Sequence, residues 1–260
     1  MLKHRVIPVL LTDGTMAVKT RCFRKPGRKV GTMVQHLQVM ESRNIDELII
    51  LDIFASRENR EPYYNKIADL TKDLFCPCTI GGGITSIKHI EKLLRSGADK
   101  VVIGRKSFDY KFIKEASAKF GSQCIVAAVD SITTPICKES DFPMHKVYSE
   151  DSSSSGILTY THIENLTDNR VGEILLTSVD REGTRTGYDL NLIKAMTNRF
   201  KIPIVANGGC GAFKDMANAL EAGANAVAAS SMFLFTPIVP MHCSMYLDNH
   251  GYKTRVETVG

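Results

Sequence analysis

Runs of consecutive apolar residues recur along the chain, and amphipathic stretches lie between them. The apolar runs are rich in valine, isoleucine and leucine and do not alternate with polar residues, which is typical of parallel strands covered on both faces. They predict strands at residues 5–11, 47–53, 76–80, 100–104, 123–130, 173–179, 202–207 and 225–230. The amphipathic stretches predict helices at about 32–42, 61–74, 86–96, 111–120, 158–166, 190–200, 213–222 and, more loosely, 239–249. This alternation indicates an α/β fold, a single (β/α)8 TIM barrel spanning residues 1–260.

An internal repeat divides the predicted barrel into two similar halves. The pair Gly82 and Gly83 recurs 126 residues later as Gly208 and Gly209, and the strand start at 47–50 recurs at the same offset. Because this offset is close to half the chain length, we expect two half-barrels of similar structure.

Each half carries a glycine-rich turn between a predicted strand and a predicted helix, at 79–84 and 205–211. Glycines there let the backbone approach an anion closely, and the helix start behind them offers unpaired N–H groups. Tight turns that need glycine only for a positive φ are the alternative. The two turns would lie on opposite sides of the barrel face that carries active sites, where they would suit a substrate with two phosphate-like ends.

Composition and charge narrow the classes of function. With 43% hydrophobic residues among 260, the chain is long enough to bury one large core. Its net charge of +5 is too small to indicate nucleic-acid binding, but it suits an anionic small-molecule substrate. No apolar run approaches the length of a membrane span.

The number and spacing of the cysteines predict a cytoplasmic location and argue against a metal site. Their odd number, seven, and the absence of a leader segment predict a cytoplasmic protein with reduced thiols. The closest pair, Cys76 and Cys78, lacks the spacing of metal ligands. We therefore expect neither a metal ion nor an organic cofactor.

Two segments interrupt the regular pattern and are expected to be long loops, at about 12–31 and 133–156. The first contains six basic and no acidic residues between positions 19 and 29. It is either a solvated loop or a flexible lid that attracts an anionic substrate. The second is expected to hold a small ribbon at 144–148 and a mobile tip.

A series of ordered motifs resembles one enzyme family along nearly the whole chain. The motifs stand at 46–53, 80–84, 97–101, 120–123, 172–184 and 187–189. Together they resemble the cyclase subunit of imidazole glycerol phosphate synthase. The resemblance implies a half-barrel repeat that takes ammonia from a glutaminase docked at the N-terminal face of the barrel. The ammonia would pass through the barrel to a doubly phosphorylated small-molecule substrate.

Four charged residues at predicted strand starts match the family's ammonia gate: Arg5, Glu47, Lys100 and Glu173. Two acids and two bases can pair into a closed ring, whereas each charge buried alone would be costly. A network that only stabilises the lower face of the barrel would use the same residues and need no partner.

Further residues match the family's active site at the other end of the strands. Asp130 matches one of two catalytic aspartates, Asp180 matches a polar active-site residue, and Lys19 matches a lysine of a mobile first loop. A carboxylate such as Asp130 can move a proton during ring closure. Substrate and phosphate binding is expected at Gly82, Gly83, Gly104, Arg105, Thr177, Gly208, Gly209, Ser230 and Ser231.

The second catalytic aspartate of the family has no counterpart at its expected position. Counting from Arg5 to Lys19 without a gap places Leu11 there, and leucine cannot exchange a proton. Asp13, two residues later, would need a loop shift to replace it. The phosphate turn after the fourth strand also differs, since the family's Asn-Thr pair is Gly104-Arg105 in this chain.

A branch of the family with the same loss resembles this chain at 5–8, Phe23, Pro26 and 30–31. Its members belong to surface-polysaccharide gene sets. This resemblance implies work with a glutaminase and a separate sugar amidotransferase, which together convert an acetamido group into an acetamidino group. A genuine cyclase of histidine biosynthesis and a non-catalytic barrel that activates a glutaminase are the alternatives.

Overall fold

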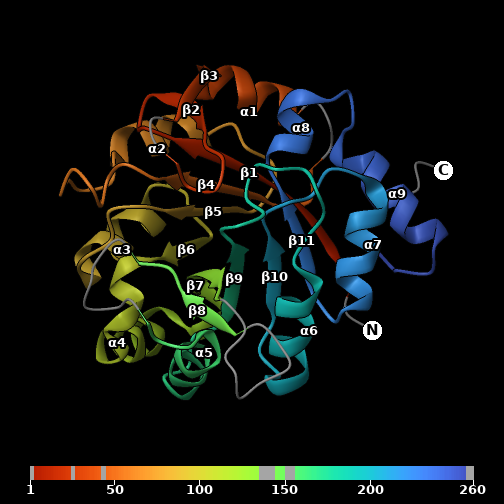
Figure 1. Cartoon of the computed structure of the whole chain (residues 1–260). Coiled ribbons are helices and arrows are strands. Elements are labelled where there is room, and N and C mark those ends of the chain that lie inside the picture. Colours follow the sequence, from red (N-terminus) through yellow and green to blue (C-terminus); the bar gives the residue numbers. More distant parts are fainter. Residues whose placement is uncertain (1–2, 25–26, 42–44, 135–143, 150–155, 256–260) are drawn as a thin grey trace.

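The computed structural model describes residues 3–24, 27–41, 45–134, 144–149 and 156–255. Eight parallel strands encircle a central axis (Figure 1). The last strand pairs with the first in parallel, from Arg5 opposite Ala226 to Pro8 opposite Ala229, and this pairing closes the barrel. The strands are β1 (Arg5–Thr12), β4 (Leu48–Asp52), β5 (Cys78–Gly81), β6 (Lys100–Ile103), β7 (Ile125–Thr133), β9 (Glu173–Ser178), β10 (Ile204–Asn207) and β11 (Ala226–Ala229).

Helices cover the outside of the barrel, so the predicted (β/α)8 fold is confirmed (Figure 1). Side-chain caps at Ser86, Asp109 and Asp189 begin three of them, each accepting a hydrogen bond from a backbone N–H in the first turn. The outer helices are α1 (Met33–Glu41), α2 (Tyr64–Thr71), α3 (Ile87–Arg95), α4 (Tyr110–Phe120), α5 (Thr159–Asp168), α6 (Leu190–Arg199), α7 (Phe213–Glu221) and α9 (Pro240–Asn249). Shorter helical turns are α8 (Ser231–Phe235), η1 (Arg105–Phe108) and η2 (Ser122–Cys124).

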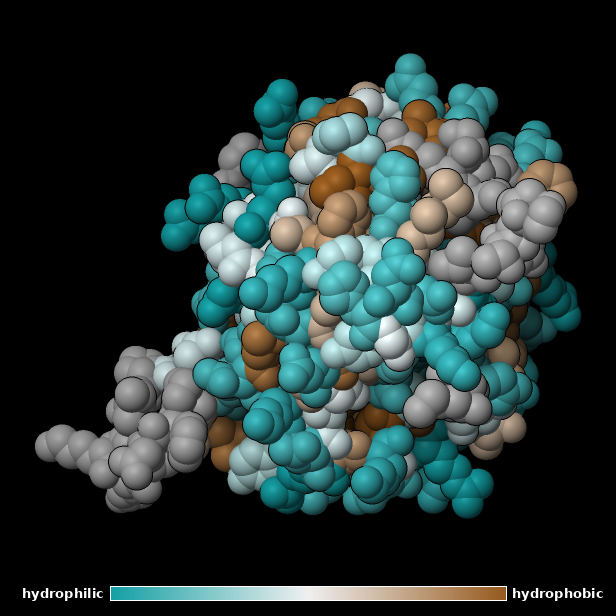
Figure 2. All heavy atoms as spheres, turned by 90° about the vertical axis from the view of Figure 1, so that its right-hand side faces the viewer, coloured by the Kyte–Doolittle hydropathy of each residue, from teal (hydrophilic) through white to brown (hydrophobic). Residues whose placement is uncertain are grey.

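Apolar side chains form two separate layers. The larger layer lies between the strands and the helices, and a smaller cluster fills the inside of the barrel. Along β1 the inner cluster takes Ile7, Val9 and Leu11, because every second side chain of a strand points inward. The side of the barrel that carries α7 and α9 is mostly hydrophilic, with scattered apolar side chains (Figure 2), as is usual for a protein surface.

Equivalent hydrogen bonds recur in the two half-barrels. The Thr71 hydroxyl donates to the carbonyl of Ser96 at 2.8 Å, and the Thr197 hydroxyl donates to the carbonyl of Ala222 at 2.7 Å. Both pairs are separated by the offset of the sequence repeat. The internal repeat therefore extends from the sequence to side-chain contacts between successive helices.

The first predicted loop is instead mostly a hairpin. Strands β2 (Met16–Lys19) and β3 (Arg28–Thr32) pair antiparallel, and β2 also pairs with the end of β1, with Val18 opposite Leu11. The prediction of a long loop at 12–31 was wrong because β2 buries Ala17 and Val18, and this burial outweighs the solvation of the basic residues around them.

The ribbon predicted in the second insertion is present. Strand β8 (His145–Val147) pairs antiparallel with the end of β7, from Ser131 opposite Val147 to Thr133 opposite His145. The expected mobile tip falls mainly on residues outside the described ranges. Across the described part of the chain, no helix has both the length and the apolar character required to cross a membrane.

Candidate active site

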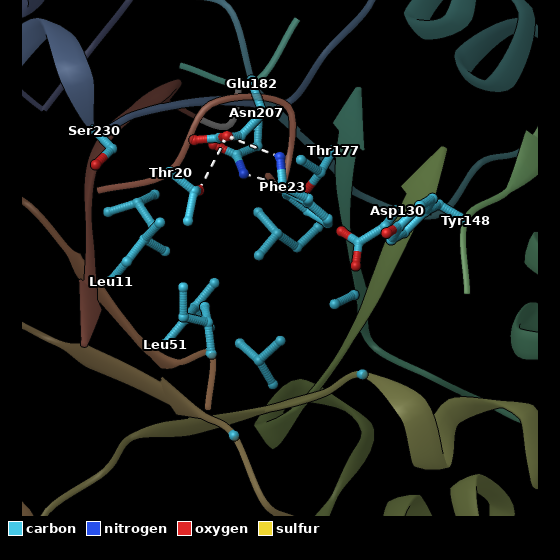
Figure 3. A pocket seen from close by; sticks show the side chains of 18 of the residues that line it. Leu11, Thr20, Phe23, Leu51, Asp130, Tyr148, Thr177, Glu182, Asn207 and Ser230 are labelled. Atoms are coloured by element: carbon cyan, nitrogen blue, oxygen red, sulfur yellow. Dashed lines mark hydrogen bonds between the residues drawn. The ribbon is translucent and has the colours of Figure 1, made fainter. Parts of the chain in front are cut away.

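A cavity of about 250 Å³ opens at the C-terminal ends of the barrel strands. Its walls include the ends of β1, β4, β7, β9 and β10 and the turns that follow them (Figure 3). The structure places every residue predicted for substrate or phosphate binding in this wall: Gly82, Gly83, Gly104, Arg105, Thr177, Gly208, Gly209, Ser230 and Ser231. The fold thus gathers residues that lie far apart in the sequence, while their role in binding stays a prediction.

The two glycine turns need glycine for both conformation and space. Gly82 has φ +114°, and a Cβ there would lie 2.3 Å from the carbonyl oxygen of Asp52. Gly208 has φ +90°, and a Cβ there would lie 2.7 Å from the carbonyl oxygen of Ser178. Any other residue would be strained and would collide with the neighbouring strand end. The backbone therefore faces the cavity directly at both turns.

Hydroxyl groups without a protein partner lie beside the second turn. Among the described residues, the buried Oγ atoms of Ser230 and Ser231 make no hydrogen bond, and both residues line the cavity. A buried hydroxyl left without a partner costs about 1–3 kcal/mol. An anion in the cavity would accept hydrogen bonds from such hydroxyls and offset that cost.

Arginine side chains line the opposite side, near the first turn. Arg57 and Arg105 both contribute to the cavity wall, and Nη1 of Arg105 donates to the carbonyl of Ser56 at 3.1 Å. The neighbouring Lys106 pairs with Asp109 at 2.9 Å instead. Of the two basic residues that the sequence offers at this turn, only Arg105 lines the cavity.

Asp130 lies at the wall of the cavity, near the end of β7 (Figure 3). Burial raises the pKa of its carboxyl to about 6, the nearby charge of Glu182 adds to the rise, and the Thr177 hydroxyl opposes it. Asn207 in turn donates to that hydroxyl at 3.1 Å. A carboxyl with this pKa exchanges protons close to neutral pH, which suits a general acid or base.

Leu11 faces Asp130 across the cavity (Figure 3). It belongs to the apolar cluster of the barrel interior and stands opposite Leu51 of β4 in the sheet register. Asp13 does not replace a carboxylate there. It is outside the cavity lining, its Oδ2 pairs with Lys29 at 3.1 Å, and its Oδ1 accepts the backbone N–H of Met16 at 2.8 Å.

Lys19 is buried rather than mobile and solvated. Its Nζ lies 2.6 Å from Oε1 of Glu182. The Thr20 hydroxyl donates to Oε2 of Glu182 at 3.1 Å (Figure 3). The sequence reasoning missed Glu182 as a cavity residue, although it lies inside the motif at 172–184. Glu182 is buried because the pairing of β2 with β1 brings Lys19 over the cavity, next to the Glu182 carboxylate.

Asp180 does not line the cavity. Its side chain is exposed, and its Oδ2 accepts the backbone N–H of Thr133 at 2.8 Å. The carboxylate therefore ties the loop after β9 to the end of β7. This placement argues against the catalytic assignment, because the side chain does not line the cavity that holds Asp130.

The four charged residues predicted as a gate form a closed ring at the opposite end of the barrel. Arg5 donates to Glu47 at 2.8 Å and also to Glu173. Lys100 Nζ lies 3.1 Å from Oε1 of Glu47 and 3.0 Å from Oε2 of Glu173. Burial opposes ionisation of Glu47, but the charges of Arg5 and Lys100 hold the pKa of its carboxyl below the usual value.

An apolar layer separates this ring from the cavity. Two positions beyond the ring residues on their strands, the inward side chains are Ile7, Ile49, Val102 and Leu175. These four side chains carry no group that could bind a proton or an ion. In the described part of the chain, no group of three or more His, Cys, Asp or Glu side chains could hold a metal ion.

The class of this protein is defined by three features: a (β/α)8 barrel of two half-barrels, a cavity at one end and a closed ionic ring at the other. The family model described as "Histidine biosynthesis protein" matches residues 5–238. The chain therefore belongs to this family, and it is a homologue of the cyclase subunit of imidazole glycerol phosphate synthase, as its motifs predict.

Two relatives illustrate the similarity. A Campylobacter jejuni protein named "Putative imidazole glycerol phosphate synthase subunit hisF2" is 38% identical over 260 residues, which cover 98% of this chain and 100% of that protein. A Dictyoglomus thermophilum protein named "Imidazole glycerol phosphate synthase subunit HisF" is 35% identical over 259 residues, which cover 99% of this chain and 100% of that protein.

Proposed function

We propose that this barrel receives ammonia from a glutaminase and delivers it for amidination of a surface-polysaccharide sugar rather than for imidazole ring closure. Two features support the proposal: the ionic ring is complete, and Leu11 lines the cavity at the position where the family resemblance implies a catalytic aspartate. Ammonia handling would need the ring, whereas ring closure between two opposed carboxylates would need the missing group. A separate sugar amidotransferase would convert the acetamido group into the acetamidino group.

The sugar acceptor is inferred from the resemblance to the polysaccharide branch, whereas the ammonia route is supported by geometry. The ring residues pair with one another, and the Thr79 hydroxyl also donates to Glu47, so breaking these pairs would uncover the apolar layer above. Neutral ammonia can cross an apolar layer, while ammonium would be costly to bury. The cavity would then receive ammonia at the side where Asp130 can take up a proton.

The glutaminase would dock at the face where the ring opens, and one exposed side chain supports this. Phe75 stands in the loop before β5 and is 95% exposed. It borders a groove that also includes Leu74, Pro77 and Asp99, and Asp99 precedes Lys100 of the ring. A large aromatic side chain at full exposure next to a groove is typical of an interface anchor.

Replacing Phe75 by serine is expected to weaken glutaminase binding about 10- to 100-fold, because an aromatic anchor typically contributes about 1–3 kcal/mol. Isothermal titration calorimetry of the variant against the glutaminase measures the loss. Phe235→Ser is the matched control, since Phe235 is 47% exposed on α8 at the opposite end of the barrel. Equal weakening by both variants would argue against docking at the ring face.

A genuine cyclase of histidine biosynthesis is the second candidate, and Asp130 favours it. This aspartate stands in the cavity with the pKa of a working acid or base. However, a single carboxylate would have to carry out proton transfers that the family divides between two. Loss of one general acid–base group lowers a rate about 10²–10⁴-fold.

Leu11→Asp separates the two candidates. We expect wild-type protein, supplied with ammonia and the histidine-pathway substrate, to close the imidazole ring very slowly, and Leu11→Asp to raise that rate at least about tenfold. Leu11→Asn is the matched control, because it adds polarity without a titratable proton. A normal rate for the wild type, unaffected by Leu11→Asp, would overturn the proposed function and support the histidine enzyme.

A further inference from the structure

In each glycine turn, at 79–84 and at 205–211, a side chain of the following helix accepts a hydrogen bond from the backbone just after the turn, and the residue type differs between the two. His89 and Asp215 are each the third residue of the helix behind a glycine turn, separated by the offset of the internal repeat. The backbone N–H of Thr85 lies 3.3 Å from His89 Nδ1, and the N–H of Gly211 lies 2.9 Å from Asp215 Oδ2. Thr85 and Gly211 are also equivalent positions, so one turn-closing hydrogen bond is made twice by different chemistry.

The Asp215 carboxylate weakens the electrostatic attraction of the second turn for an anion. Its Oδ2 also accepts the N–H of Ala212 at 2.9 Å, so the carboxylate occupies two backbone donors in front of α7. A negative charge in the first turn of a helix also offsets the positive end of the helix dipole. The second turn therefore presents a weaker positive potential to a ligand.

His89 leaves the first turn without such a charge. Helix α3 has no acidic residue in its first turn. Besides the contact with Thr85, Nδ1 of His89 lies 3.2 Å from the carbonyl of Gly83, and Nε2 lies 3.4 Å from Oε1 of Glu61. When Nδ1 accepts from the Thr85 N–H it cannot also donate to the Gly83 carbonyl, so the ring closes the turn at Thr85 while adding no negative charge of its own.

Charges in the cavity wall reinforce this difference. Arg57 and Arg105 line the cavity beside the first turn, and the nearby Asp52 is already paired with Arg60 at 2.7 Å. Beside the second turn, Arg185 is the cavity-lining arginine among the described residues. Guanidinium groups bind phosphate more strongly than neutral hydroxyls do, because their hydrogen bonds are charge-assisted.

We propose that the cavity is electrostatically asymmetric: the first turn, held by His89 as a positioning residue, binds a phosphate dianion more tightly than the second turn does. The substrate would then place its more highly charged end against Gly82 and Gly83 and a less charged anionic end against Ser230 and Ser231. This inference rests on a cavity substrate with two anionic ends, as the two glycine turns predict, and not on the ammonia delivery of the proposed function.

An amide NMR titration with inorganic phosphate at about pH 8, where the dianion predominates, tests the proposal in the full-length protein. The amides of Gly82 and Gly83 report the first turn, and those of Gly208 and Gly209 report the second. We expect a dissociation constant at least about threefold lower at the first turn. Equal constants, or tighter binding at the second turn, would overturn the proposal.

Paired substitutions separate charge from turn structure. His89→Asn and His89→Asp each keep an acceptor for the Thr85 N–H, but only His89→Asp adds a negative charge. We expect phosphate binding at the first turn to be about three- to tenfold weaker in His89→Asp than in His89→Asn. Asp215→Asn should tighten binding at the second turn. Equal affinities of the two His89 variants for phosphate would refute an electrostatic effect of the charge at position 89. Neither result depends on whether the protein uses ammonia.

Discussion

Replacing Arg5 by methionine is expected to lower the free energy of unfolding by about 3–5 kcal/mol, the cost of removing one partner from a buried ion pair. Arg5 serves both carboxylates of the ring, and the Glu47 and Glu173 side chains are almost fully buried. Without Arg5, Lys100 alone would have to neutralise two buried negative charges. Urea denaturation followed by circular dichroism measures the change.

The control for this variant is an ion pair of similar length on the surface. Arg199 and Glu164 lie 3.2 Å apart, and both side chains are about half exposed. Arg199→Met should therefore change the free energy of unfolding by less than about 1 kcal/mol, because exposed pairs are screened by water and salt. A loss at Arg5 no larger than the loss at Arg199 would show that the ring carries little stability.

The stability of the ring should also depend on pH in a defined direction. The pKa of Glu47 is lowered in the folded protein, so its ionised form is favoured by folding. The stabilisation from ionised Glu47 is fully present above the pKa of a glutamate in the unfolded chain, about 4.3. It is lost as the pH falls through the lower pKa of Glu47 in the folded protein. Acidification should therefore shrink the difference in unfolding free energy between wild type and Arg5→Met. A difference that stays constant down to low pH would contradict this linkage.

Asp130→Asn is expected to lower the ammonia-dependent rate about 10²–10⁴-fold, the usual effect of removing a general acid–base group. The asparagine side chain keeps the shape and the hydrogen bond with the Thr177 hydroxyl but cannot exchange a proton. A steady-state assay of ring closure in the Leu11→Asp background, with ammonia and the histidine-pathway substrate, measures the loss. An unchanged rate would show that Asp130 transfers no proton in this cavity.

The same substitution should stabilise the fold at neutral pH. A carboxylate kept for structure would instead stabilise the fold, and replacing it would lower the stability. The pKa of Asp130 is raised to about 6, so keeping the group ionised in the folded state is unfavourable above that pH. The unfolded pKa is about 3.9, and the penalty appears as the pH rises from there and is complete above about 6. Asp130→Asn removes a penalty of up to about 3 kcal/mol at pH 7. Wild type and variant should therefore converge in stability below about pH 4.

Much of the fold follows from local patterns. The barrel strands were predictable because parallel strands buried on both faces read as continuous apolar runs, and β1 and β9 begin at the predicted residues, Arg5 and Glu173. Helix starts were also local, since Asp109 and Asp189 cap the helices that follow them. The β2–β3 hairpin was missed because it depends on pairing with β1, which a short apolar run among basic residues does not reveal.

The candidate site was predictable only in part. Glycine turns and matching motifs predicted many of the residues that line the cavity. The uninterrupted count from Arg5 to Lys19 placed Leu11 where the resemblance implies an aspartate, and that assignment stays a prediction. The sequence did not reveal that Lys19 is buried against Glu182, because that contact joins the hairpin to the loop after β9. It also assigned Asp180 to the site, whereas the turn of the chain directs that side chain to the N–H of Thr133.

By itself the sequence determined the barrel and its two halves, because apolar periodicity and repeat spacing are local properties. Only the tertiary structure decided which charges pair. It closed Arg5, Glu47, Lys100 and Glu173 into a ring, and it placed Asp130 where burial raises the pKa of its carboxyl. Pairing and desolvation depend on distances between segments that are remote in sequence, and folding alone sets those distances.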